Sequence, residues 1–147
     1  MNQTTYSFLD SVVVIAHPLL ATAAIILTGE GVGKAVVSMS ENKTAIDIAA
    51  DGAPMVSKIA GNIGTITIDV QQTSAAHKKL LNLYNKLNIG DTLSWAQASI
   101  TMRNVVDGTG HIATGVAFQK VPDKGYEKEG KQISWVFMCA DIQNLTT

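Results

Sequence analysis

The stretch "GTITIDVQQTSAAHKKLLNLYNKL", residues 64–87, changes its periodicity half way along and thereby decides the fold. Its first half alternates apolar and polar residues, which is the pattern of a β-strand with one buried face. The apolar positions of that strand are Ile66, Ile68 and Val70. Its second half repeats apolar residues at intervals of three and four, which is the pattern of an amphipathic helix. We therefore expect a strand followed directly by one packed helix at about residues 74–87.

The predicted helix has start and stop signals at both ends. Thr73 or Ser74 can serve as the N-cap, and Gly90 lies just beyond the last apolar residue. The apolar stripe is narrow and consists of Ala76, Leu80, Leu83, Tyr84 and Leu87. The other faces are polar, and we expect His77 among them to face solvent. Such a helix lies on a surface and covers one face of a sheet.

The rest of the chain indicates β-strands separated by turns. Extended segments are expected at residues 4–16, 21–28, 34–41 and 43–51, and a strand pair around the turn "DGTG" at 107–110. The closing segment "ISWVFMCADI" is apolar on both faces, which indicates burial between two layers or against another subunit. The prediction is a mainly β fold of about seven to nine strands, a sandwich or barrel with one packed α-helix.

Composition indicates one domain that associates with other chains. The chain has 147 residues, which is most simply one domain spanning 1–147. Charged residues make up 16% of it, whereas a typical soluble domain has about 25%. Because a small monomer needs charge to keep its surface hydrated, this shortage predicts that other chains cover much of the surface. The net charge of −1 indicates no strong attraction to nucleic acid or membranes.

One apolar segment has about the length needed to span a membrane. It is "SVVVIAHPLLATAAIILTG", residues 11–29. His17 and Pro18 interrupt its middle, and no positive charge precedes it. Two β-strands joined by a turn at "AHPLLA" explain these features better, so no membrane association is expected.

The motifs of catalysis and ligand binding are weak. "GEGVGKAV" at 29–36 lacks the first glycine and the hydroxyl residue of a phosphate loop, so a hairpin turn near 29–34 is the simpler interpretation. His17, His77 and His111 lack ligand spacing, and the only cysteine, Cys139, lies in the most apolar strand. We therefore expect no enzyme activity, no catalytic residues, no cofactor and no metal.

Several strands instead pair an apolar face with a row of small polar side chains. One row is Thr65, Thr67, Asp69 and Gln71; a second is Ser99, Thr101 and Arg103; a third is Ala45, Asp47, Ala49 and Asp51. The ordinary explanation is a solvated sheet face. The alternative is that such rows line a water-filled passage shared by several subunits.

The chain resembles the small tail tube proteins of contractile-tailed bacteriophages. The resemblance rests on "TYSFLD", "ADG" at 50–52, "GTITIDVQQTSAAHKKLLNLYN", "ITMRN", "ATGVAFQKVPD" and "WVFMCADI", in that order over nearly the whole length. It implies a β-barrel-like sandwich with one helix, similar in plan to the tube protein of bacterial type VI secretion. It also implies homohexameric rings that stack into a tube, through whose lumen DNA passes without specific binding.

The same resemblance implies partners and a location. The partners would be other copies of the chain, a contracting tail sheath protein, and baseplate and terminator proteins. The protein would belong to the phage virion and would assemble in the cytoplasm of the bacterial host. The expected lumen-facing residues are Thr65, Thr67, Asp69 and Gln71. The expected inter-ring contacts, from the loops at 51–62 and 122–131, are Asp51, Pro54, Met55, Lys58, Asp123, Lys124 and Glu127.

One other function fits the aliphatic composition. A monomeric or small-oligomer β-barrel that binds an apolar ligand would use the same residues to line its pocket. Size measurement distinguishes the two, because the first hypothesis requires rings or long tubes and the second a compact particle.

Overall fold

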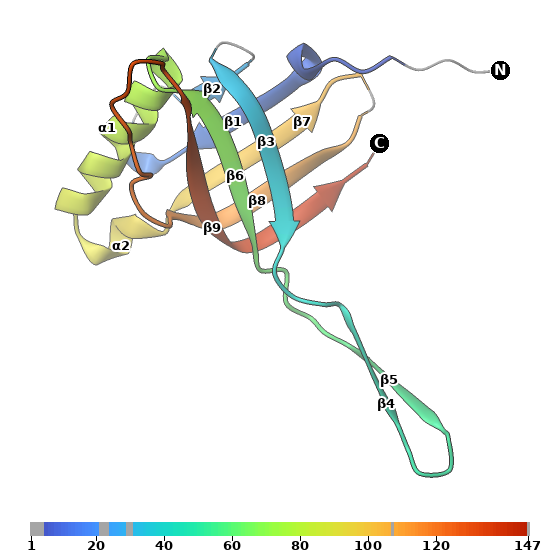
Figure 1. The fold of residues 1–147 in the computed structure, drawn as a ribbon. Helices are drawn as coiled ribbons and strands as arrows, with labels where there is room; N and C mark the ends of the chain where they lie inside the picture. Colours follow the sequence, from blue (N-terminus) through green and yellow to red (C-terminus); the bar gives the residue numbers. More distant parts are fainter. Residues whose placement is uncertain (1–4, 21–23, 29–30, 107, 147) are drawn as a thin grey trace.

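The computed structural model describes residues 5–20, 24–28, 31–106 and 108–146. Seven antiparallel strands form one sheet that curls into a half-barrel, and a long helix packs against its concave side (Figure 1). Two further strands form a separate hairpin that extends away from the sheet. The mainly β fold with one packed helix is therefore confirmed.

The sheet has the strand order β2-β1-β7-β8-β9-β6-β3. Its strands are β1 (Ser11–Ala16), β2 (Ile25–Leu27), β3 (Val32–Met39), β6 (Gly64–Gln71), β7 (Ala98–Asn104), β8 (Gly110–Phe118) and β9 (Gln132–Leu145). The separate hairpin is β4 (Thr44–Ile48) and β5 (Pro54–Lys58). Short 3₁₀ helices lie at Phe8–Asp10 and Pro18–Leu20, and a short helix, α2, at Thr92–Trp95.

The opening stretch folds as its two periodicities predict. β6 buries every second residue, from Gly64 to Val70. Helix α1 (Ala75–Ile89) begins after Ser74, whose Oγ accepts a hydrogen bond from the His77 backbone N–H at 3.2 Å. Gly90 ends the helix by donating its N–H to the Lys86 carbonyl. Of the two predicted caps, Ser74 is therefore the one used.

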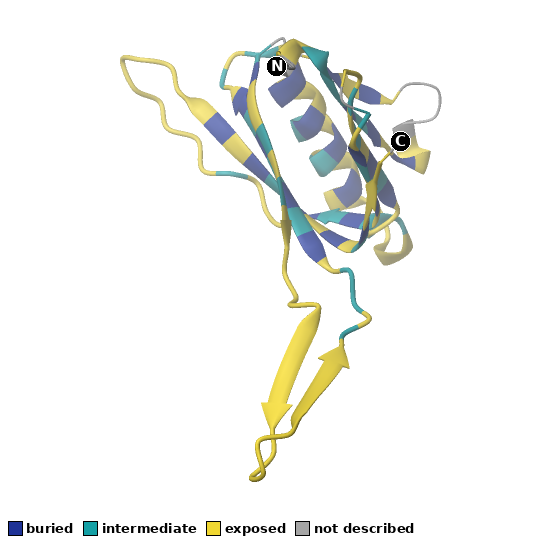
Figure 2. Ribbon diagram, turned by 90° about the vertical axis from the view of Figure 1, so that its right-hand side faces the viewer, coloured by how far each residue is buried: buried dark blue, intermediate teal, exposed yellow. Residues whose placement is uncertain are grey.

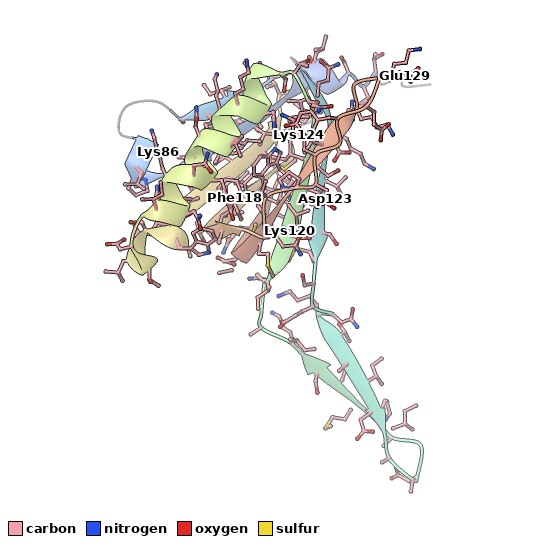
Figure 3. The ribbon with its side chains drawn as sticks, turned by 60° about the vertical axis from the view of Figure 1, so that its left-hand side comes forward. Lys86, Phe118, Lys120, Asp123, Lys124 and Glu129 are labelled. Atoms are coloured by element: carbon pink, nitrogen blue, oxygen red, sulfur yellow. The ribbon has the colours of Figure 1, made fainter. Side chains whose placement is uncertain are left out.

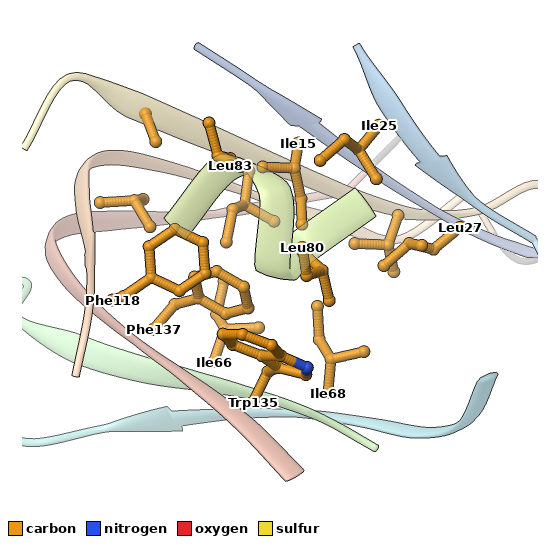
Figure 4. Packing of buried hydrophobic residues seen from close by; sticks show 14 of the residues in the cluster. Ile15, Ile25, Leu27, Ile66, Ile68, Leu80, Leu83, Phe118, Trp135 and Phe137 are labelled. Atoms are coloured by element: carbon orange, nitrogen blue, oxygen red, sulfur yellow. The ribbon is translucent and has the colours of Figure 1, made fainter. Parts of the chain in front are cut away.

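The core lies between α1 and the concave face of the sheet (Figure 4). Leu80, Leu83 and Leu87 of α1 are fully buried against Trp135 and Phe137 of β9. Burial of each of these side chains stabilises the fold by about 1.5–3 kcal/mol. Because the helix covers only one side of the sheet, the convex side remains open.

Two local predictions are wrong. His77, expected to face solvent, is 4% exposed and lies in the core, where its ring contacts that of Trp135. The hairpin expected near 29–34 does not join its flanking strands, because β2 and β3 are the opposite edges of the sheet; Gly29 and Glu30 lie outside the described residues.

The segment at 11–29 forms strands rather than a span. β1 and β2 pair antiparallel, with Val13 opposite Leu27, as the interpretation of two strands and a turn requires. No helix within the described residues has both the length and the apolar character needed to cross a bilayer.

The closing strand is covered on one face only. In β9 the concave side is buried, whereas Met138 on the other side is 52% exposed and Val136 is half-buried. The apolar pattern of this strand predicts that both of its faces are buried. The subunit itself buries only the concave face.

Candidate assembly surfaces

The first polar row lies on the convex face of the sheet, as expected of residues that alternate with the buried side of β6. Thr65, Thr67 and Asp69 are half-buried and Gln71 is exposed. Their cross-strand neighbours on β3 are Ser38, Val36 and Lys34, and those on β9 are Met138, Val136 and Ser134. The row is therefore polar along β6 but is flanked by apolar side chains beside Thr65 and Thr67.

Charges on this face are balanced locally. Asp69 lies directly opposite Lys34 of β3 and accepts a hydrogen bond from Ser134 Oγ at 2.5 Å. A carboxylate beside a lysine lowers the net positive potential that the lysine alone would create. This part of the convex face consequently presents no uncompensated cation.

The second and third polar rows do not share one surface. Thr101 and Arg103 are exposed on β7, within the seven-stranded sheet. Asp47 lies on β4, in the separate two-stranded hairpin. The third row therefore lies on the hairpin and not on the seven-stranded sheet.

The segment expected to be a loop at 51–62 is largely one side of that hairpin. We call residues 41–58 the arm; all of them are exposed (Figure 2). Asp51 lies in the turn, where its carboxylate accepts a hydrogen bond from the Ala53 N–H at 3.0 Å. The structure therefore brings together four of the predicted contact residues on one projection: Asp51, Pro54, Met55 and Lys58.

At the root of the arm, a lysine binds several acceptors. Lys43 Nζ donates to the carbonyl of Gly61 and to the Asn62 side chain, and lies 3.4 Å from the Ile59 carbonyl. The Ile142 N–H donates to the Asn62 carbonyl at 2.9 Å. These bonds connect the arm to the end of β9 and so orient it relative to the sheet.

The remaining predicted contacts lie on the connecting segment 119–131, between β8 and β9 (Figure 3). Asp123, Lys124 and Glu127 are exposed there. Glu127 forms a salt bridge of 2.8 Å with Lys131, and Lys124 Nζ lies 5.3 Å from the centre of the Tyr126 ring. Exposed pairs of this kind contribute less than about 1 kcal/mol, so they shape the segment only weakly.

The arm and this segment lie at opposite ends of β6. The arm leaves the sheet where Met39 pairs with Gly64, at the start of β6. Beyond the end of β6, Gln72 donates its N–H to the Lys131 carbonyl and its side-chain amide to the Gly125 carbonyl. The two sets of predicted contact residues are therefore not brought together but placed at two ends of one subunit.

The two edges of the sheet are strands without a second neighbour. β2 pairs only with β1, and β3 pairs only with β6, within the described residues. An edge strand presents backbone N–H and C=O groups that can pair with another chain. Sequence periodicity does not reveal such edges, because strand order depends on contacts between distant segments.

The described residues contain no group of three or more His, Cys, Asp and Glu side chains that could hold a metal. Cys139 is 2% exposed, and burial raises the pKa of its thiol to about 11. Such a thiol is protonated at neutral pH and is a poor nucleophile.

Comparison with known sequences places these surfaces in context. A family profile described as "Bacteriophage PhiTE tail tube protein" matches residues 3–146. No curated protein matches the chain significantly.

Three solved structures have a similar fold at very low sequence identity. A chain of the sixfold-symmetrised cryo-EM structure of the anti-feeding prophage baseplate has a TM-score of 0.69 and 8% identity, covering 99% of this chain and 98% of that one. A chain of the tube-terminating cap of the same prophage has a TM-score of 0.60 and 9% identity, covering 100% and 94%. A chain of the extended sheath–tube complex of the extracellular contractile injection system PVC has a TM-score of 0.57 and 10% identity, covering 92% and 88%.

Proposed function

The chain belongs to the bacteriophage PhiTE tail tube protein family, and from this premise we propose that it forms homohexameric rings that stack into a DNA-conducting tube. Membership of this family makes it a structural component of a phage tail and not an enzyme. The ring, its symmetry and its lumen are our inference.

One structural observation carries the proposal, namely the two unpaired edges of the seven-stranded sheet. β3 has eight residues and β2 has three, and each has a neighbour on one side only within the described residues. Joining β3 of one subunit to the β2 side of the next would pair β2 with part of the longer β3 and continue the sheet around a ring. Closure of this kind also removes the aggregation hazard of an open edge.

The convex face supports the proposed lumen. In a ring built through these edges, the convex row Thr65, Thr67, Asp69 and Gln71 would face the passage. Each lysine or arginine that contacts phosphate adds affinity through counterion release, so a conduit must present few of them. Asp69 beside Lys34 fits this requirement, because the pair carries no net charge toward a polyanion.

The arm and the segment 119–131 support stacking. Because they lie at opposite ends of β6, one subunit can contact a ring on either side. Asp51, Pro54, Met55 and Lys58 would make contacts at one end. Asp123, Lys124 and Glu127 would make them at the other.

The expected partners follow from the same assembly. Structures of similar fold come from a baseplate, a tube-terminating cap and a sheath–tube complex. We extend this to a tail sheath protein, baseplate and terminator proteins around the present tube, in a virion assembled in the host cytoplasm.

The apolar-ligand hypothesis is less well supported. The concave side of the half-barrel, where such a ligand would bind, is filled by α1 and by buried aromatic side chains such as Trp135 and Phe137.

Negative-stain electron microscopy of the purified protein tests the proposal, with light scattering to measure mass. The expected result is rings of six subunits and tubes whose length grows with concentration. A monomer that persists from dilute to concentrated solution would overturn it.

A further inference from the structure

The arm has one apolar face that the rest of its chain leaves uncovered. Residues directly opposite each other in an antiparallel pair point to the same side of a hairpin. Ile46 pairs with Val56 and Ile48 with Pro54, so these four side chains form the apolar part of one face, with the Thr44–Lys58 pair on the same face at the root of the arm. The other face carries Asp47, Met55, Ala45 and Ser57.

This arrangement is incomplete in an isolated subunit. Ile48 is 68% exposed and Val56 is 65% exposed. A two-stranded hairpin alone is marginally stable in water and needs a further strand or a packed layer. Pro54 has no N–H to donate to a further strand, so strand addition at that edge of the arm is disfavoured. The apolar face therefore remains available for side-chain packing.

A surface of matching character lies elsewhere on the subunit. We call it the mouth; it is an open cavity of about 230 Å³ whose lining combines polar side chains with apolar ones, among them Val13, Ala35 and Met102. Tyr6, His111 and Arg103 also line it, and none of its lining residues is acidic. The outer part of the arm, residues 45–57, has the opposite charge, because its charged residues are Asp47 and Asp51, whereas Lys43 and Lys58 lie at the root.

The arm of one subunit does not reach its own mouth. It leaves the sheet between β3 and β6 and extends away from it (Figure 1). The residues that line the mouth come instead from the start of β1, the end of β7 and the start of β8. Because the two surfaces are distinct, a contact between them is heterologous and repeats from one subunit to the next.

We propose that the apolar face of the arm docks in the mouth of a second copy of this chain, with the acidic tip toward Arg103. The inference rests on the proposed function and names the partner surface for the arm. It predicts that growth of the tube depends on Ile46, Ile48 and Val56, whereas Met55, on the opposite face, contributes little.

A matched pair of variants tests which face docks. Ile48→Asp places a carboxylate on the apolar face, and Met55→Asp places the same group on the other face at a site of similar exposure. We expect Ile48→Asp to raise the protein concentration needed for tube formation at least tenfold, with an unchanged circular dichroism melt. Met55→Asp should stay within twofold of the wild type. Equal effects of the two variants would overturn the assignment of the face.

Disulfide trapping tests where the arm docks. The double variant Ile48→Cys with Tyr6→Cys should form a ladder of dimers, trimers and longer chains on oxidation of assembled protein. The control combines Ile48→Cys with Asn82→Cys on the exposed side of α1. Native Cys139 is buried and should not take part. Bands that stop at dimers would overturn the head-to-tail contact, and a ladder from the control alone would overturn the mouth.

The outcomes separate this inference from the proposed function. If the wild type forms tubes and Ile48→Asp forms them equally well, only the docking of the arm fails. If the wild type forms no tubes and the double cysteine variant forms no cross-linked ladder, both proposals fail.

Discussion

Trp135 donates its indole N–H to Nδ1 of His77 across 3.1 Å, inside the core where α1 meets β9. An acceptor at Nδ1 requires the neutral tautomer that carries its proton on Nε2. Nε2 is itself buried and finds no hydrogen-bond partner among the described residues. Protonation of the ring would direct a second N–H against that of Trp135, and no Asp or Glu is among the buried residues that the structure describes.

Acid should therefore destabilise the subunit through His77. Burial first, and the charge of Lys124 second, lower the pKa of His77 below its ordinary 6.5. The unfolded chain then binds more protons than the folded one as pH falls below about 6.5, so the free energy of unfolding falls with it. Urea unfolding at pH 8, 7, 6 and 5 measures this dependence.

Two variants compare His77 with His111. His77→Gln should flatten the fall in stability between pH 7 and 5 while lowering stability at pH 8. His111→Gln removes a half-exposed imidazole outside the core and is the control. An unchanged slope in His77→Gln would refute the role of this ring.

Loss of the helix cap should weaken the subunit measurably. Ser74→Ala removes the acceptor for the His77 N–H and is expected to cost about 1 kcal/mol of unfolding free energy. Thr73→Ala, one residue earlier and exposed, should change stability by less than about 0.5 kcal/mol. Thermal or urea unfolding compares the two, and a larger loss in Thr73→Ala would mean that the cap is misassigned.

Gly115 should resist substitution because of its backbone. Its φ of +62° suits glycine, and a Cβ there would lie 2.8 Å from the Cβ of Ala140 on β9. Gly115→Ala is expected to lower the free energy of unfolding by about 1–3 kcal/mol. Gly130→Ala is the control, since a Cβ at that position meets no atom within 4 Å. Similar stabilities for the two variants would contradict the strained geometry.

A cation in the proposed lumen should slow DNA without preventing assembly. Thr67→Lys adds a charge between Val36 and Val136 on the convex face. We expect tubes of normal appearance, slower DNA ejection from phage that carry the variant, and partial recovery at higher salt as phosphate contacts are screened. Asn82→Lys, on the exposed side of α1, should eject DNA at the wild-type rate. Failure of Thr67→Lys to fold would show that this position is buried.

Much of this protein could be predicted from local pattern. The alternation of Ile66, Ile68 and Val70 predicts the buried side of β6, and the three-and-four spacing after Ser74 predicts α1 to within two residues at its end. These features depend on residues close together in the sequence, and the periodicity of apolar residues directly indicates them. The resemblance to tail tube proteins likewise rests on short stretches in order and is confirmed by the family match.

Local pattern fails where an outcome depends on distant contacts. His77 is polar and has polar neighbours in the sequence, yet the partner that makes its burial tolerable is Trp135 on β9, remote in the chain. Likewise, alternation in residues 44–48 predicts extended structure, but it does not predict the partner strand at 54–58, in the segment expected to be a loop, or the arm that the pair forms outside the sheet.

The sequence by itself therefore determined the local structures, namely the strand of β6 and the helix after it, and the low share of charged residues, 16%. Only the tertiary structure decided strand order, and with it the two open edges at β2 and β3, the projecting arm and the mouth. The physical reason is that the periodicity of apolar residues indicates which side of a helix or strand is buried. Sheet edges and cavities depend instead on which helices and strands lie next to one another in the fold.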